Sequence, residues 1–275
     1  MELVVTEINI YPIKSLGGIS LNEALVEPKG LQYDRRWMLV DKNMRHMTQR
    51  EFKNMALLQT EIKEGRIHIS HKQKPEISFS FSATEFLPES FQVTVWDDTC
   101  QANEVSVEAS AWFSEVLDTP CQLVKMPEDF VRPTEPEYSA SENDHVSFAD
   151  GYPMLMFDEA SVNLISEKSG EEIPANRFRA NVIFKGGHAH IEDELKRFSI
   201  GDLEFYGAKV CTRCILTTID QDTAVRGKEP LKTLSTYRKI DNKIKFGMNV
   251  IPVDLGTIKV GDRITIKETT EPIAF

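Results

Sequence analysis

The chain has 275 residues, of which 41% are hydrophobic and 27% charged, so it can bury a large core and shows no sign of disorder. Its net charge of −11 argues against nucleic-acid or anionic-membrane binding, because either partner needs a basic surface. The first residues do not resemble a signal peptide, and no apolar run approaches a membrane span of ~20 residues, so we expect a cytoplasmic protein. With only four cysteines, we expect no disulfide framework.

The first half of the chain is predicted to be a series of short strands separated by polar turns. Apolar residues there alternate with polar ones or form β-branched runs, which is typical of strands. Residues 105–117 instead show the spacing of an amphipathic helix. The predicted strands cover residues 3–11, 21–28, 33–41, 56–60, 66–70, 77–81, 91–96 and 121–126.

Residues 127–145 are predicted to form a loop, because prolines and acidic residues leave few apolar anchors there. Loops of this length in compact chains are usually functional or mobile. We place a domain boundary just before this loop, between an N-terminal domain of residues 1–122 and a C-terminal domain of residues 123–275.

The second half mixes strands with two helices. Residues 158–170 are expected to be helical with Asp158 or Ser161 as the cap, and a short helix is expected at residues 230–237. Many short strands with few helices indicate a fold that is mainly β with some α, built around a β-barrel core. The predicted strands cover residues 154–157, 177–184, 198–205, 208–210, 215–219, 246–252 and 256–266.

Two of these regions carry cations that could meet an anion. Residues 14–18 follow the first strand, and their glycines would let backbone N–H groups turn toward a ligand, although by themselves they fit an exposed surface turn better. In the predicted strand 177–184, Arg177, Arg179 and Asn181 would share one face, which suggests an anion or a carboxylate opposite.

Arg35 and Arg36 raise the same question in the strand 33–41. They would point to opposite faces, so one of them shares the face of Asp34 and Met38. A buried guanidinium needs an anionic partner, whereas an exposed one does not. The sequence leaves both possibilities open.

Cys211 and Cys214 form a Cys-x-x-Cys pair, a spacing that three kinds of site use. A redox dithiol lies at a strand-to-helix turn, whereas both flanks of this pair are predicted to be strands. A zinc site needs two further thiolate or imidazole ligands, and neither Cys100, Cys121 nor the scattered histidines have the spacing for it. The third possibility is one thiolate ligand beside a cysteine that binds nothing.

Strand geometry separates the two thiols. In an extended chain Cys211 and Cys214 would point to opposite faces, and Thr212 would share the face of Cys214. A single thiolate, with arginines elsewhere for an anionic group, suits a soft transition metal carried on a phosphorylated cofactor. A buried structural cysteine fits the same pattern, so these residues alone do not decide between the two.

Six motifs, in order along nearly the whole chain, resemble those of the MOSC family that carries an N-terminal β-barrel domain. The motifs are similar to those of the mitochondrial amidoxime-reducing components and the bacterial YcbX-type reductases. The resemblance implies a MOSC-type β-barrel core preceded by a β-rich N-terminal domain. The motifs are Tyr11-Pro12-Ile13-Lys14-Ser15, Asp34-Arg35-Arg36-Trp37, Phe148-Ala149-Asp150, Arg177-Phe178-Arg179-Ala180-Asn181, Cys211-Thr212-Arg213-Cys214-Ile215-Leu216-Thr217-Thr218 and Gly256-Thr257-Ile258-Lys259-Val260-Gly261-Asp262.

The resemblance implies a molybdenum cofactor, a molybdopterin whose dithiolene holds molybdenum, with one protein thiolate as a further ligand. By motif match the metal ligand is Cys214, a catalytic residue, and Cys211 is not a ligand. Asp150 matches an acidic residue near the metal and is the second expected catalytic residue, as a source of protons. Asn249 stands where some relatives carry tyrosine. The residues expected to bind the cofactor are Lys14, Ser15, Arg36, Arg179, Thr212 and Asn249.

The resemblance further implies a reductase of small N-hydroxylated compounds, such as hydroxylamines, amidoximes and N-hydroxylated nucleobases. YcbX-type relatives carry a ferredoxin-like domain with four cysteines, and no such set follows the last predicted strand here. We therefore expect a separate electron donor of the ferredoxin, cytochrome or flavin-reductase type. The alternative is a protein that binds or carries the cofactor, or transfers sulfur, without reducing a substrate. A cofactor sulfurase itself would need a pyridoxal-phosphate domain, for which 275 residues leave no room.

Overall fold

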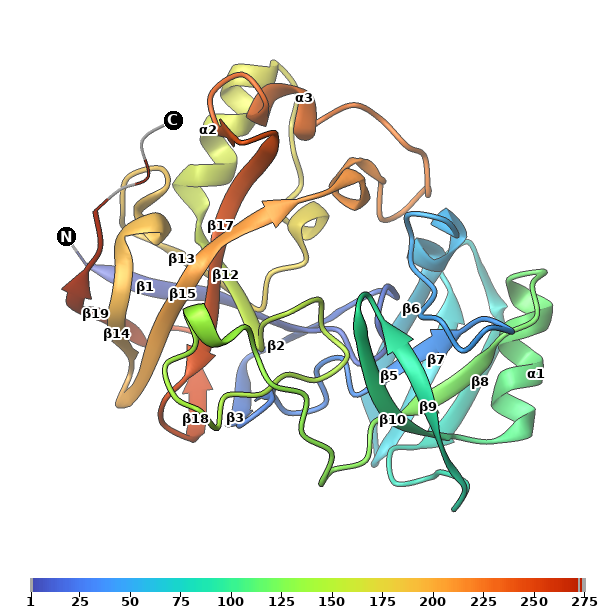
Figure 1. Ribbon diagram of the computed structural model, residues 1–275. Coiled ribbons are helices and arrows are strands. Elements are labelled where there is room, and N and C mark those ends of the chain that lie inside the picture. The colour runs from blue at the N-terminus through green and yellow to red at the C-terminus, as the bar shows by residue number, and fades with distance from the viewer. Residues whose placement is uncertain (1, 272, 274–275) are drawn as a thin grey trace.

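In the computed structural model, which describes residues 2–271 and 273, seven strands form a closed barrel (Figure 1). In order around the barrel they are β12 (Met154–Asp158), β13 (Val182–Lys185), β1 (Leu3–Ile10), β19 (Arg263–Thr269), β14 (Leu195–Ile200), β15 (Leu203–Arg213) and β17 (Lys243–Pro252). β17 pairs back with β12, and this pairing closes the ring. Two short strands extend the sheet at β1 and β17, namely β2 (Ile19–Leu21) and β16 (Lys239–Ile240).

The barrel interior is filled by apolar side chains that alternate along each strand with side chains facing outward. Val5 and Ile8 of β1 are both buried although they are three positions apart, because the register shifts between Val5 and Glu7. The largest side chains of this core are Phe184, Phe198 and Phe205.

Segments from both sides of the predicted domain boundary share sheets. β1, the first strand of the chain, lies between β13 and β19, with Val5 opposite Phe184. A small sheet joins distant segments in the same way and consists of β4 (Gly30–Leu31), β3 (Glu23–Glu27) and β18 (Gly256–Lys259). The boundary between residues 122 and 123 stays a prediction.

A second β-rich body lies beside the barrel (Figure 1). One of its sheets has the order β5 (Trp37–Val40), β11 (Gln122–Lys125), β10 (Asp98–Glu104) and β9 (Ser90–Val95), and the other β6 (Leu58–Lys63), β7 (Arg66–His71) and β8 (Lys74–Ser82). Ser106 is the N-cap of helix α1 (Val107–Val116), and its hydroxyl accepts a hydrogen bond from the Ala109 N–H. Phe113 of this helix packs in one core with Trp37 and Phe81.

The remaining helices are short. Helix α2 (Glu159–Ser169) is capped by the Asp158 carboxylate and ends at Gly170, whose φ of 76° is the left-handed conformation common at helix ends. No helix in the described part of the chain has the length and apolar content that crossing a membrane requires. The other short helices are α3 (Leu231–Leu234) and the 3-10 turns η1 (Lys53–Leu57), η2 (Pro136–Tyr138), η3 (Ala175–Phe178), η4 (Ile191–Glu194) and η5 (Ile215–Thr218).

The predicted fold class, mainly β with some α, is confirmed, but two predicted strands are wrong. Residues 177–184 begin as the 3-10 turn η3, Arg179 follows in a left-handed conformation with a φ of 54°, and only β13 is extended. Residues 215–219 form η5 instead of a strand. Phe178 and Ala180 of the first segment and Thr217, Thr218 and Ile219 of the second are buried, and their packing in the tertiary structure overrides the local preference for extended chain.

Candidate functional site

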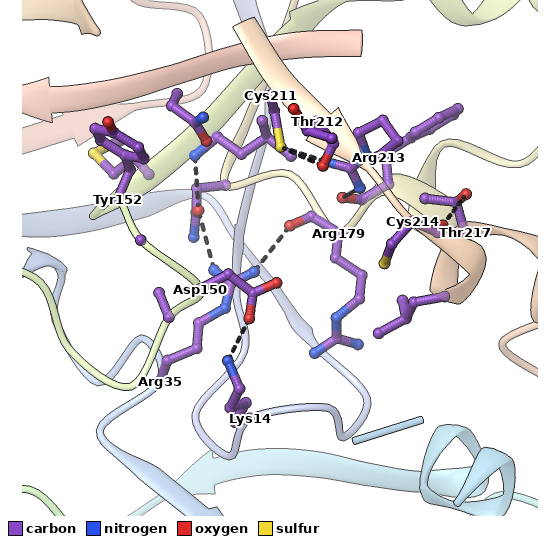
Figure 2. Close-up of a pocket in the computed structure, with 18 of the residues that line it drawn as sticks. Lys14, Arg35, Asp150, Tyr152, Arg179, Cys211, Thr212, Arg213, Cys214 and Thr217 are labelled. Atoms are coloured by element: carbon purple, nitrogen blue, oxygen red, sulfur yellow. Dashed lines mark hydrogen bonds and ion pairs between the residues drawn. The ribbon is translucent and has the colours of Figure 1, made fainter. Parts of the chain in front are cut away.

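A cavity of about 780 Å³, counted out to its open mouth, lies where the two bodies meet, and Figure 2 shows the side chains that line it. The structure brings seven of the eight predicted site residues into its lining, and Arg36 is the exception. The seven are Lys14, Ser15, Asp150, Arg179, Thr212, Cys214 and Asn249.

The cavity lining is strongly cationic, although the chain as a whole carries a net charge of −11. Among its described residues, Asp150 supplies the only carboxylate. A concave, cationic surface focuses a positive potential and selects anionic ligands. The cations are Lys14, Arg35, Arg50, Arg179 and Arg213.

Lys14 and Asp150 form an ion pair inside the cavity. The Lys14 ammonium donates to the Phe148 carbonyl at 2.8 Å and lies 2.5 Å from Asp150 Oδ1. Burial lowers the pKa of Lys14, and Asp150 opposes this shift. Desolvation within the cavity would raise the pKa of Asp150, but Lys14 and then Arg50 outweigh it and hold this pKa well below the usual range. The Asp150 side chain is 63% exposed, so solvent screens the pair, and the carboxyl is ionised at neutral pH.

Arg35 and Arg179 both stack on the Tyr11 ring, with their guanidinium carbons 4.3 and 4.2 Å from its centroid. Arg35 is fully engaged, since it donates to Asp34 Oδ2 at 2.6 Å, to Asn181 Oδ1 at 3.0 Å and to the Arg179 carbonyl at 3.0 Å. Arg179 is different, because its buried Nη2 has no hydrogen-bond partner. Burial lowers the pKa of Arg179 to about 10, and the guanidinium stays charged. A buried charged donor without a partner fits a site for an anion.

Arg36 lies outside the cavity, which corrects its predicted placement there. It is buried, with Nη2 2.8 Å from Glu27 Oε2 and Nη1 donating to the Lys29 carbonyl at 3.2 Å. Arg35 faces the cavity instead. The strand begins only at Trp37, and a left-handed φ of 50° at Arg35 breaks the alternation from which the prediction was made.

Cys211 and Cys214 both line the cavity, so the predicted separation onto opposite faces does not hold. Two irregularities explain this, because the β15 register shifts between Val210 and Thr212 and the strand ends at Arg213. Cys214 precedes the turn η5, which also overturns the assumption that strands flank the pair. All four cysteines of the chain are free thiols.

The two thiols have different partners. The Cys211 sulfur accepts a hydrogen bond from Arg213 Nη1 at 3.3 Å, whereas the Cys214 sulfur accepts one from Arg50 Nε at 3.1 Å. The Thr212 hydroxyl accepts from the Lys245 ammonium at 3.0 Å. Within residues 2–271 and 273, no group of three or more His, Cys, Asp or Glu side chains is arranged to hold a metal ion.

Arg50 is a residue of this site that no motif in the sequence indicated. It lies in an irregular segment between β5 and β6, so no periodic pattern marks it. Its guanidinium stacks on Trp96 at 4.1 Å from the ring centroid, and its Nη2 lies 3.6 Å from Asp150 Oδ2. The Trp96 indole N–H in turn donates to Asp150 Oδ1 at 3.2 Å.

Two protein families match the chain in succession. Residues 2–120 match the MOSC N-terminal beta barrel domain, and residues 143–265 match the MOSC domain. The two matches follow the order of the motifs quoted above and agree with the barrel architecture.

Individual relatives resemble most of the chain. Mitochondrial amidoxime-reducing component 1 of Mus musculus is 29% identical over 94% of this chain and 81% of its own length. Molybdenum cofactor sulfurase of Danio rerio is 27% identical over 88% of this chain, which corresponds to 31% of that protein. Among solved structures, the YUAD protein from Bacillus subtilis is 13% identical with a TM-score of 0.46 over 98% of both chains.

Proposed function

The chain belongs to the MOSC family, with a MOSC N-terminal β-barrel domain followed by a MOSC domain, and from this premise we propose that its cavity binds a molybdenum cofactor and that the protein reduces N-hydroxylated compounds. The relatives named amidoxime-reducing components, which align over most of their length, support the reductase activity. The observation that carries the proposal is the unpaired, buried Nη2 of Arg179 in a cationic cavity that also contains the Cys214 thiol.

The side chains present fit a phosphorylated metal cofactor. Arg179, Arg35 and Lys14 offer the positive charge that a phosphate and a pterin require, and an arginine adds a planar fork of donors. Cys214 offers a soft thiolate, the ligand type that suits such a metal. Ser15, Thr212 and Asn249 add neutral polar groups to the lining. Arg36 has no place in this proposal, because it does not line the cavity.

When bound, the cofactor supplies a metal centre that performs two-electron redox chemistry. The net reaction consumes two electrons and two protons, converts the N–OH group to N–H and releases water. We assign the electrons to a separate donor of the ferredoxin, cytochrome or flavin-reductase type, and the substrates to small N-hydroxylated molecules.

Lys14 and Asp150 are the groups that handle protons in this proposal. The Asp150 carboxylate is ionised, so by itself it accepts a proton rather than storing one. Lys14 Nζ holds a proton 2.5 Å from Asp150 Oδ1, and burial makes this ammonium easier to deprotonate. Lys14 Nζ is therefore the group that carries a proton in the cavity, Asp150 orients this ammonium, and the exposed carboxylate is open to exchange with water.

A second function, cofactor binding or sulfur transfer without reduction, has its own support. A molybdenum cofactor sulfurase also aligns with this chain, and a second thiol, Cys211, lines the same cavity. The two functions differ in what happens after the cofactor is bound.

Metal and pterin analysis of protein from a cofactor-producing host, followed by a benzamidoxime reduction assay with a competent electron donor, tests the proposal. We expect bound molybdenum and turnover. Bound cofactor without turnover would favour the carrier function, and the absence of both molybdenum and pterin would refute the proposal.

Substitution of each cysteine tests the assignment of the ligand. Cys214→Ser should abolish turnover and release molybdenum, because a hydroxyl is a poor substitute for a thiolate. Cys211→Ser is the matched control and should keep both cofactor and turnover. Equal damage from the two substitutions would show that Cys214 is not the single protein ligand.

A further inference from the structure

Arg50 contacts both groups to which the proposed function assigns chemistry. Its Nε donates to the Cys214 sulfur at 3.1 Å, and its Nη2 lies 3.6 Å from Asp150 Oδ2. The guanidinium therefore joins the thiol that would bind the metal to the carboxylate that would move protons.

The backbone of Arg50 is tied to the other body of the molecule. The neighbouring Gln49 is fully buried and exchanges two side-chain amide hydrogen bonds with Gln221, at 3.1 and 3.0 Å. Gln49 also donates to the Ser15 carbonyl at 2.7 Å, and Arg226 donates to the Arg50 carbonyl at 2.6 Å. These contacts fix the position of Arg50 relative to the segment that follows Cys214.

The Arg50 side chain is also held from one face. Its guanidinium lies 4.1 Å from the Trp96 ring centroid, and the Trp96 N–H donates to Asp150. Trp96 adopts a left-handed φ of 56°, a strained conformation for a bulky residue, at the turn between β9 and β10. Strain of this kind persists only where surrounding contacts enforce it. Here the strained residue is Trp96, which supports the Arg50 guanidinium.

From these contacts we infer that Arg50 is a positioning residue that orients the Cys214 sulfur toward the cavity and draws electron density from it. This inference rests on the proposed function. A cationic hydrogen-bond donor withdraws charge from a thiolate, and hydrogen bonds to ligand sulfurs are among the features that set the reduction potential of a metal site. Arg50 thus raises the reduction potential of the metal bound by Cys214.

The test compares loaded wild-type protein with Arg50→Ala, Arg50→Lys and Arg45→Ala. Arg45 is the matched control, because it is an exposed arginine on the same segment and pairs with the exposed Glu51 at 3.7 Å. The measurements are molybdenum content, the midpoint potential of the metal and its electron paramagnetic resonance spectrum. The melting temperature of each cofactor-free protein is measured in parallel.

We expect Arg50→Ala to lower the midpoint potential, to change the spectrum and to reduce either turnover or metal affinity about 10- to 100-fold. Arg50→Lys keeps the charge but loses the planar stack and the Nε donor, so its shift should be intermediate. Arg45→Ala should match the wild type in every measurement.

A wild-type potential and spectrum in the loaded Arg50 variants would overturn the inference while leaving the proposed function intact. If neither Arg50 variant retains the cofactor, the melting temperatures of the cofactor-free proteins distinguish a role in positioning from a role in fold stability. Unchanged melting temperatures would support a role in positioning the ligand, whereas lowered ones would show that Arg50 only stabilises the fold. Wild-type protein without molybdenum would refute the proposed function itself, and the inference with it.

Discussion

Three of the polar residues that line the cavity adopt left-handed backbone conformations. Their φ angles are 68° at Ser15, 50° at Arg35 and 54° at Arg179. Such conformations are uncommon outside glycine, and strained ones cost on the order of 1–3 kcal/mol each. They turn side chains out of the alternation of neighbouring strands, and this is how Arg35 rather than Arg36 comes to face the cavity.

His46 makes the stability of the folded protein depend on pH. It is buried against Trp96, with ring centroids 4.6 Å apart. Burial, with a smaller contribution from Lys14, lowers its pKa from 6.5 to about 4. Between these two values the unfolded chain binds a proton that the folded protein does not, so stability falls as the pH falls through this window, by on the order of 3 kcal/mol.

His46→Gln should remove this contribution. Unfolding by urea at several values between pH 7 and pH 4 should show a shallower loss of stability than in the wild type. His68→Gln, on strand β7 and outside the cavity, is the control and should follow the wild-type curve. Parallel curves for His46→Gln and the wild type would contradict the prediction.

Strand β15 connects the barrel to the cavity. Its first residues pair with β14 and β17 in the barrel wall, and its last residues carry Cys211 and Thr212. Its register with β17 shifts twice, between Gly207 and Lys209 and between Val210 and Thr212. Such irregularities bend a strand and redirect side chains, which explains why both thiols reach the cavity.

Gly207 is required where β15 passes β14. A Cβ atom at this position would lie 1.8 Å from the Leu195 carbonyl oxygen, which is backbone and cannot move aside. Gly207→Ala should therefore destabilise the fold by about 1–3 kcal/mol, measured by denaturant unfolding. For the control Gly227→Ala the nearest atom is 3.7 Å away, so wild-type stability is expected. A fully stable Gly207→Ala protein would show that this close approach is not needed.

At the scale of the whole molecule, the cavity exists because two bodies meet. Lys14, Arg35 and Arg50 come from the first 50 residues, whereas Asp150 and Cys214 come from the second half of the chain. The second half also supplies the cations Arg179 and Arg213, but Lys14, Arg35 and Arg50 complete the lining only from the first half, so the relative position of the two bodies determines the geometry of the site.

The buried pair of Gln49 and Gln221 holds this relative position. Each amide satisfies the other, so Gln49→Ala leaves a buried partner unpaired and should destabilise the protein by about 1–3 kcal/mol. In a double-mutant cycle with Gln221→Ala, unfolding free energies should deviate from additivity by about 0.5–3 kcal/mol. The exposed pair of Ser20 and Asn9 is the control, with little expected coupling. Additive losses at Gln49 and Gln221 would mean that their contact does not join the two bodies.

Local patterns in the sequence determined most of the elements. Period-2 alternation identified the strands near β7, β8 and β9, and helical spacing identified α1, because these signals depend only on neighbouring residues. The kinds of side chain at the site could also be predicted, since a thiol, hydroxyls and cations occur in short motifs of the sequence. The residues from Lys14 to Asn249 that these motifs indicated do converge on one cavity, except Arg36.

The tertiary structure alone decided how these residues meet. The choice of Arg35 over Arg36 depends on a left-handed φ, the 3-10 turn after Cys214 depends on burial, and the contact of Arg50 joins residues 164 positions apart. Closure of the barrel likewise depends on pairing between β12 and β17. These features arise from packing between distant segments, so no local pattern of polarity or propensity contains them.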